Sequence, residues 1–157
     1  MDAADLRFPE DSFDNILCVQ AAFLFDTREQ FLCEAYRVLT PGGCLALSDL
    51  LLPSRYAASL IRRIPLANFI PNIEQYRMLY ERCGFANVRI VEARTRCWEA
   101  HRDYQRNFIW GKFVNGEIPR ARLRQFVRRL QGRDWLFSNY LLVSATKPHR
   151  RASEIRR

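Results

Sequence analysis

The segment DNILCVQAAFLFDTREQFLCEAYRVLTPGGCLALS, residues 14–48, contains the pattern that decides the fold. Residues 14–19 form a short apolar run that is typical of a buried strand in a parallel sheet. Apolar residues then recur at helical spacing after Asp26, an acidic residue at the expected N-cap position. A Pro-Gly-Gly turn at 41–43 ends this helix, and a second apolar run follows at 44–48. Strand, helix and strand in this order predict a βαβ unit of an α/β fold.

The predicted helix after Asp26 has one apolar and one polar side, and Arg28, Glu34 and Arg37 fall on the polar side. Beyond residue 50 the same reasoning predicts alternating helices and strands. The expected helices are a short one at 56–64, then 73–83, 99–113 and one that begins at Pro119, and the expected strands are 88–91 and 135–145.

Length and composition predict one folded domain with a sizeable core, because the chain has 157 residues and 48% of them are hydrophobic. No apolar run approaches the ~20 residues of a membrane span, and because the first residues are acidic we expect no secretory signal there. The five cysteines include no CxxC pair and the chain has two histidines, so we expect no metal site. These features favour five reduced thiols in a cytoplasmic protein.

The net charge of +8 is unevenly distributed along the chain. Residues 1–50 contain nine acidic and three basic residues, a net charge of −6, whereas residues 51–157 contain eight acidic and 22 basic residues, a net charge of +14. The arginines after Pro119 lie opposite an apolar helix face and are interpreted as a solvated surface. No nucleic-acid-binding motif accompanies them, so nucleic acid is not the favoured partner. The aromatic residues of the carboxy-terminal half are interpreted mostly as core, and they are Phe108, Trp110, Phe113, Trp135, Phe137 and Tyr140.

A series of short motifs appears in a fixed order along residues 2–148. The motifs are Asp2-Ala3, Phe8-Pro9, Ser12-Phe13-Asp14, Arg37-Val38-Leu39, Pro41-Gly42-Gly43, RCGF at 82–85 and YLLVSATKP at 140–148. In this order and spacing they resemble the later part of a class I S-adenosylmethionine-dependent methyltransferase, of the small-molecule, methyltransferase type 11-like kind.

The resemblance implies a partial Rossmann-like methyltransferase fold, made of the later strands of a seven-stranded, mostly parallel sheet whose last strand is antiparallel. Residues 1–148 would be the carboxy-terminal part of that domain, and 149–157 a basic disordered tail. The glycine-rich motif of the family is not found in this sequence. We therefore expect a truncated or partial chain whose first strand is left as an open sheet edge and which alone binds S-adenosylmethionine weakly or not at all.

The resemblance also implies a cofactor site. Asp2 and Ala3 would contact the adenine, Leu6 would line the same pocket, and Val19 and Gln20 would face the methionine part at the carboxyl end of their strand. Other interpretations remain open at this stage, because Asp2 could form an ordinary Asx turn and Gln20 could be a solvated loop residue.

The sequence assigns no catalytic base, and the candidates are His101, Tyr76 and Asp49. Methyl transfer from a sulfonium is an in-line displacement that needs positioning, with a base only where the acceptor must lose a proton. His101 has a suitable intrinsic pKa, although a surface position is the simpler interpretation. Asp49 follows the second strand at the ligand-binding edge, and it could touch a substrate or cap the next segment.

The sequence thus predicts methyl transfer to O, N or C of a small-molecule acceptor. Two alternatives remain. The open sheet edge would suit a non-catalytic interaction module that pairs with a second chain completing the sheet, and the basic carboxy-terminal half would suit a nucleic-acid methyltransferase.

Overall fold

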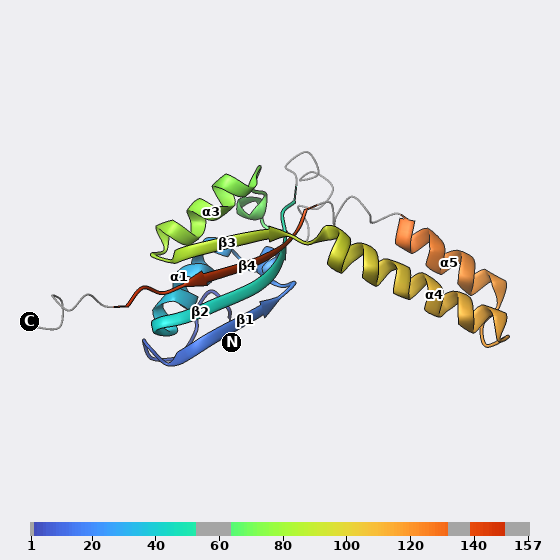
Figure 1. Ribbon diagram of the computed structural model, residues 1–157, viewed down its shortest axis with the longest axis horizontal. Helices are drawn as coiled ribbons and strands as arrows, with labels where there is room; N and C mark the ends of the chain where they lie inside the picture. Colours follow the sequence, from blue (N-terminus) through green and yellow to red (C-terminus); the bar gives the residue numbers. More distant parts are fainter. Residues whose placement is uncertain (1, 53–63, 132–138, 150–157) are drawn as a thin grey trace, which may run out of the picture. The chain divides into compact units, whose positions relative to one another are not determined.

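The computed structural model describes residues 2–52, 64–131 and 139–149, and Figure 1 shows the arrangement. The expected helix at 56–64 and the start of the expected last strand therefore fall largely outside the described residues, as does the predicted tail. The elements are β1 (Phe13–Val19), a 3₁₀ turn (Ala22–Leu24), α1 (Arg28–Val38), β2 (Leu39–Leu50), a 3₁₀ turn (Leu66–Asn68), α3 (Ile73–Arg82), β3 (Ala86–Glu92), a π-helical turn (Arg94–Glu99), α4 (Ala100–Val114), α5 (Arg120–Gln131) and β4 (Tyr140–Thr146). None of these helices is long and apolar enough to cross a membrane.

The four strands form one mixed sheet in the order β1-β2-β4-β3. β1 and β2 are parallel, joined through α1, which confirms the predicted βαβ unit. The backbone N–H of Lys147, just after β4, donates to Gly43 near the start of β2. Likewise, the N–H of Ala93, just after β3, donates to Tyr140 at the start of β4. The last strand therefore runs antiparallel to both of its neighbours, as the arrowheads in Figure 1 show.

α1 and α3 cover one face of the sheet and enclose the hydrophobic core. Leu32 from α1, Tyr80 from α3, Leu45 from β2 and Leu141 from β4 are all fully buried in one cluster. Burial of apolar side chains on one face follows from the alternation of the strands and the apolar stripe of each helix. This layer holds the carboxyl ends of β1 and β2 in place.

The prediction that the first strand is buried was wrong. β1 lies at the edge of the described sheet, and Leu17 and Val19 are 75% and 65% exposed. Only Cys18 on the opposite side of the strand is buried. A continuous apolar run cannot distinguish a strand covered on both faces from one covered on a single face. The expected open edge with bare apolar surface is what the described residues show.

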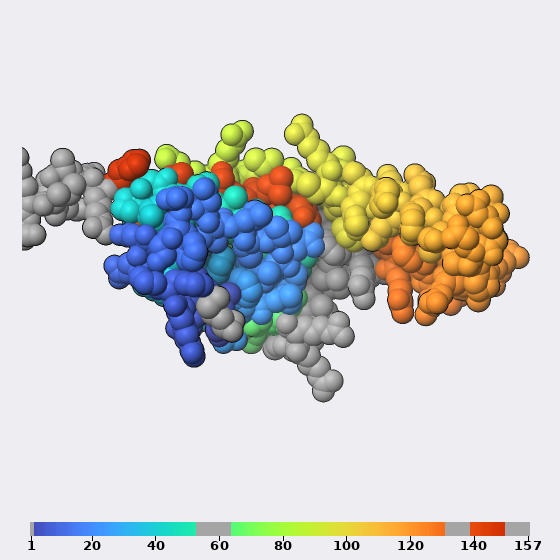
Figure 2. Space-filling model, turned by 90° about the horizontal axis from the view of Figure 1, so that it is seen from below, coloured from blue at the N-terminus to red at the C-terminus, as the bar shows by residue number. Residues whose placement is uncertain are grey.

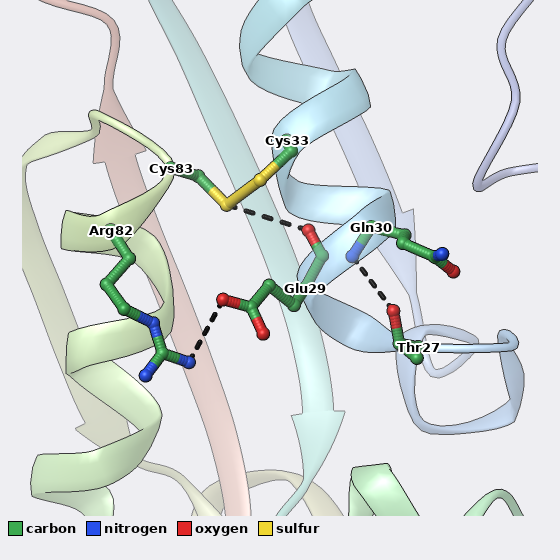
Figure 3. Close-up of a disulfide and its surroundings, with 6 residues drawn as sticks. All are labelled: Thr27, Glu29, Gln30, Cys33, Arg82 and Cys83. Atoms are coloured by element: carbon green, nitrogen blue, oxygen red, sulfur yellow. Dashed lines mark hydrogen bonds and ion pairs between the residues drawn. A yellow bond between two sulfur atoms is a disulfide. The ribbon is translucent and has the colours of Figure 1, made fainter.

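α1 begins one residue later than the acidic N-cap that the sequence suggested. The side chain of Thr27, not Asp26, caps the helix by accepting a hydrogen bond of 3.0 Å from the backbone N–H of Gln30 (Figure 3). The helix ends at Val38, and residues 40–43 already belong to β2. The predicted Pro-Gly-Gly turn is therefore the start of a strand, where Gly42 adopts a φ of +87°.

A disulfide between Cys33 and Cys83 links α1 to the end of α3 (Figure 3). The prediction of five reduced thiols was therefore wrong, because two cysteines 50 residues apart in sequence meet on neighbouring helices. An ion pair of 3.1 Å between Glu29 and Arg82 lies beside the disulfide and joins the same two helices. Cys18, Cys44 and Cys97 are free thiols.

α3 confirms the helix predicted near 73–83. Asn72 caps its start by accepting from the N–H of Gln75, and Gly84 follows its end with a φ of +98°. A Cβ on Gly84 would lie 2.8 Å from the ring of Tyr36, so glycine is required both for the backbone conformation and for space.

Residues Glu92–Tyr140 form a second compact unit, which is described by itself. Its helices α4 and α5 lie side by side in both views (Figures 1 and 2). Phe108 and Trp110 on α4 are 53% and 56% exposed, so their assignment to the core was wrong. Tyr140 is buried as expected, whereas Trp135 and Phe137 lie outside the described residues.

Candidate cofactor and substrate site

The carboxyl ends of β1 and β2 form the edge at which open α/β sheets bind ligands. Val19 is the last residue of β1, and Gln20 follows it with a φ of +50°, a left-handed conformation that turns the chain away from the sheet. The backbone N–H of Gln20 donates to the carbonyl of Ser48 at 2.9 Å and lies 3.2 Å from the Ser48 hydroxyl oxygen. Both predicted residues therefore lie at this edge, with exposed side chains.

Asp2, Ala3 and Leu6 belong to a separate segment that precedes β1. The Asp2 carboxylate accepts a hydrogen bond of 3.0 Å from the backbone N–H of Ala4, and the N–H of Asp5 donates to the Asp2 carbonyl. This is the Asx-type turn that the sequence left open as an alternative. The Asp2 side chain is exposed, while Ala3 packs against the hydrophobic core.

The segment around Leu6 is hydrogen-bonded to two charged side chains of α1, Glu34 and Arg37. The Glu34 carboxylate accepts from the N–H of Leu6 at 2.9 Å, and the Arg37 guanidinium donates to the carbonyls of Leu6 and Phe8 at 2.7 and 2.9 Å. Glu34 and Arg37 also bind each other at 2.9 Å. The hydrogen bond from Arg37 holds the pKa of Glu34 below its usual range, and the bond to Glu34 raises the pKa of Arg37.

Asp49, near the end of β2, is completely buried and fully hydrogen-bonded. Its Oδ2 accepts from the Arg28 Nε at 2.7 Å and from the Tyr76 hydroxyl at 2.7 Å, and its Oδ1 accepts from the N–H of Leu50 at 2.8 Å. The Tyr80 hydroxyl donates to Tyr76 at 2.9 Å. The structure thus brings two of the three catalytic candidates, Asp49 and Tyr76, into direct contact in the interior.

Arg28 is the cation of this cluster, with 2% of its surface exposed. Its guanidinium also donates to the carbonyls of Leu50 and Asn68, and its backbone N–H donates to the Asn68 side-chain oxygen at 2.8 Å. The Asn68 amide in turn donates to the carbonyls of Phe23 and Phe25. The cluster therefore ties the start of α1, the end of β2 and the segment before α3 to one another.

Burial raises the pKa of the Tyr76 and Tyr80 hydroxyls, and it raises that of Tyr76 well above the usual value for a tyrosine. Each hydroxyl therefore stays protonated and acts as a hydrogen-bond donor. Burial likewise raises the pKa of the Cys18 thiol, with a smaller contribution from Asp49. A closed and fully paired cluster is suited to hold the strand ends in position rather than to accept a substrate proton.

His101, the third catalytic candidate, lies on α4 in the second unit. Its side chain is exposed, with the Trp98 ring 6.2 Å away between ring centroids. Among the described residues, no group of three or more His, Cys, Asp and Glu side chains is placed to hold a metal ion.

The sequence interpretation missed Arg28 and Asn68, and it placed Arg28 on the polar side of the helix. A signal for Arg28 was present, because a cation in the first turn of a helix is disfavoured by the helix dipole and calls for a carboxylate partner. Asn68 follows no recognisable pattern, and only the three-dimensional structure reveals its position.

Comparison with known proteins shows which proteins this chain resembles. Residues 1–47 match the family model described as a methyltransferase domain. The chain is 26% identical over 165 residues to erythromycin 3''-O-methyltransferase of Saccharopolyspora erythraea, an alignment that covers 93% of this chain and 54% of that protein. It is 32% identical over 107 residues to demethylmenaquinone methyltransferase of Tropheryma whipplei, covering 54% of this chain and 45% of the relative. The chain thus spans about half the length of these relatives.

The fold has solved counterparts. The structure of phosphoethanolamine N-methyltransferase 2 from Haemonchus contortus, in complex with phosphomonomethylethanolamine and S-adenosylhomocysteine, superposes with a TM-score of 0.72 at 17% identity. The match covers 94% of this chain and 36% of that one. The chain thus matches a methyltransferase domain over residues 1–47, is similar in sequence to these two methyltransferases, and shares its described fold with a solved one.

Proposed function

We propose that this chain is part of an enzyme that transfers a methyl group from S-adenosylmethionine to O, N or C of a small-molecule acceptor. The observation that carries the proposal is the strand order β1-β2-β4-β3 with an antiparallel last strand, combined with the match of residues 1–47 to a methyltransferase domain. Relatives named for macrolide and quinone substrates favour a small-molecule acceptor.

The cofactor supplies an activated methyl group, so the protein has mainly to bind and orient the two reactants. In this proposal the exposed Asp2 carboxylate accepts from the adenine amine and the backbone N–H of Ala3 donates to a ring nitrogen, with Leu6 lining the same pocket. Val19 and Gln20, both exposed at the carboxyl edge of β1, face the methionine part. The positions and accessibility of these residues fit such a ligand.

Asp49 and Tyr76 act as positioning residues in this proposal. Their cluster with Arg28 fixes the end of β2 beside Gln20, which is bound to Ser48 immediately before Asp49. His101 is the remaining candidate for a base, and its exposed side chain leaves it accessible to an acceptor.

We further propose that residues 1–148 supply the later strands of a seven-stranded sheet, completed on the exposed side of β1. The exposed apolar side chains Leu17 and Val19 support this, because such surface is normally covered in a doubly wound fold. The coverage of about half of each relative is consistent with it.

The test is isothermal titration of S-adenosylmethionine into the 157-residue chain and into the same chain expressed with any sequence that precedes it in frame. We expect weak or undetectable binding to the former and tighter binding to the latter. A micromolar dissociation constant for the 157-residue chain would contradict the partial-sheet proposal. Absence of binding and of methyl transfer in the longer polypeptide would contradict the proposed activity.

The exposed β1 edge also favours a second candidate, a non-catalytic module that pairs with another chain. A discrete dimer or hetero-complex on a sizing column, lost when Leu17 is replaced by Lys, would support it. A monomeric elution profile unaffected by Leu17→Lys would count against it.

A further inference from the structure

A groove between α4 and α5 has the features of a ligand site. Its volume is about 370 Å³, within the range of sites for small organic molecules. It lies within the second unit, and its walls come from α4, from α5 and from the connection between them. The lining residues are Ile109, Lys112, Ile118, Arg122, Gln125, Phe126 and Arg129.

Two guanidinium groups flank this groove and have no carboxylate partner within the described part of the chain. Helix α5 contains no acidic residue, and among the described residues neither Arg122 nor Arg129 forms an ion pair. Lys112 differs, because its ammonium binds Glu117 at 2.6 Å. Anion recognition in the groove therefore falls to the two arginines.

The rest of the lining is apolar. Ile109 from α4, Ile118 from the connection and Phe126 from α5 are each partly buried, so the groove keeps an apolar floor that is open to a ligand. Arg122 and Arg129 are seven residues apart, which places them about 10 Å from each other along one side of α5. A headgroup bound at either arginine would leave its tail lying over this floor.

We propose that the α4–α5 groove binds an anionic amphiphile, a molecule with one phosphate or carboxylate headgroup and an alkyl or aryl tail. The headgroup would accept charge-assisted hydrogen bonds from Arg122 or Arg129, and the tail would bury apolar surface on Phe126 and the two isoleucines. The inference concerns the second unit alone and does not rest on the proposed methyl transfer.

A phosphodiester backbone explains the arginines but not the apolar floor, because nucleic acids bind through phosphate contacts and base stacking. A lipid surface would engage the exposed aromatic side of α4, where Tyr104 and Phe108 stack at 6.2 Å, rather than the groove. Both are therefore outcomes that the experiment must separate from the groove-bound molecule.

The test is isothermal titration of dodecyl phosphate, below its aggregation threshold, into the full chain. We expect saturable binding with one ligand per chain, and an affinity at least about tenfold lower in the double variant Arg122→Gln/Arg129→Gln, because one lost charge-assisted hydrogen bond is worth about a factor of ten. Dodecyl maltoside, which has no charge, and inorganic phosphate, which has no tail, should each bind far more weakly.

The matched control is Arg120→Gln/Arg128→Gln, which removes the same charge from the same helix but from residues outside the groove. It should retain affinity within about twofold. Equal loss in both double variants would overturn the proposal, as would equal binding of dodecyl maltoside or inorganic phosphate. Binding only to anionic vesicles or only to an oligonucleotide would also overturn it.

A second variant tests the floor. Ile118→Asp places a carboxylate in the groove and should lower dodecyl phosphate affinity without loss of helical circular dichroism. Unchanged affinity in Ile118→Asp would contradict the placement of the ligand.

Discussion

Replacing Asp49 with Asn should destabilise the chain far more than an ordinary single substitution. The change keeps the size of the side chain but leaves one acceptor oxygen where the carboxylate has two, so Tyr76 and Leu50 no longer each have an oxygen to donate to. It also leaves the Arg28 cation buried without its counter-ion, which is the larger effect. Both side chains of the pair are at most 2% exposed, so solvent offers little compensation.

The magnitude follows from this burial. Removing one partner of a buried ion pair costs about 3–5 kcal/mol. Natural domains are stable by about 5–15 kcal/mol, so the loss is a large fraction of the total. For a chain of this length each kcal/mol lowers the melting temperature by roughly 2–4 °C, so we expect a decrease of about 6–20 °C.

The assay is thermal and urea unfolding followed by circular dichroism, with Asp103→Asn as the control. Asp103 forms an exposed ion pair with Arg106 at 3.2 Å, and its loss should cost about 0.5 kcal/mol or less. A double variant that replaces Arg28 with Met and Asp49 with Leu should be less destabilised than the two single changes added together. If Asp49→Asn unfolds no more readily than Asp103→Asn, the structural role argued for the cluster is refuted.

Three further results are expected. Replacing Cys33 and Cys83 with Ser should lower the free energy of unfolding, measured in urea, by about 4 kcal/mol, because the unfolded chain is no longer restricted by the cross-link. An equally stable variant would contradict the disulfide. Iodoacetamide at mildly alkaline pH should modify Cys18 last among the free thiols, as followed by peptide mass spectrometry, because burial raises its pKa; rapid labelling would contradict this. Because the pKa of Glu34 is lowered in the folded state, its bond with Arg37 stabilises the fold above the ordinary pKa of 4.5, and this stabilisation is lost as pH falls through the lower, folded value. Glu34→Gln should therefore flatten the plot of unfolding free energy against pH below pH 4.5. An unaltered plot would exclude a contribution of this ion pair to stability.

Secondary structure was predictable where apolar residues recur with a regular period and where a residue that ends a helix follows them. The βαβ unit was predictable because an apolar run, a helical stripe and a second apolar run follow one another within residues 14–48. α3 was predictable to within one residue, because Gly84 can adopt a backbone conformation that other residues avoid. Local rules of this kind do not depend on distant parts of the chain.

The features that the sequence interpretation missed depend on contacts between distant residues. The pairing of Arg28 with Asp49 and of Cys33 with Cys83 joins residues 21 and 50 positions apart, and residue order alone does not reveal such neighbours. The exposure of Leu17 has the same cause, because a strand's coverage depends on what else packs on it.

The position of β4 has a consequence for the order in which the protein folds. This strand lies between β2 and β3, yet it is made after them and after both helices of the second unit. Until the ribosome releases residues 140–146, β3 has no hydrogen-bonding neighbour that would join it to the parallel pair, and the Lys147 ammonium cannot reach the Asp11 carboxylate that it binds at 2.8 Å. A nascent chain halted before this point would therefore expose two further unpaired strand edges, one on β2 and one on β3, a form that is prone to aggregation and to chaperone binding.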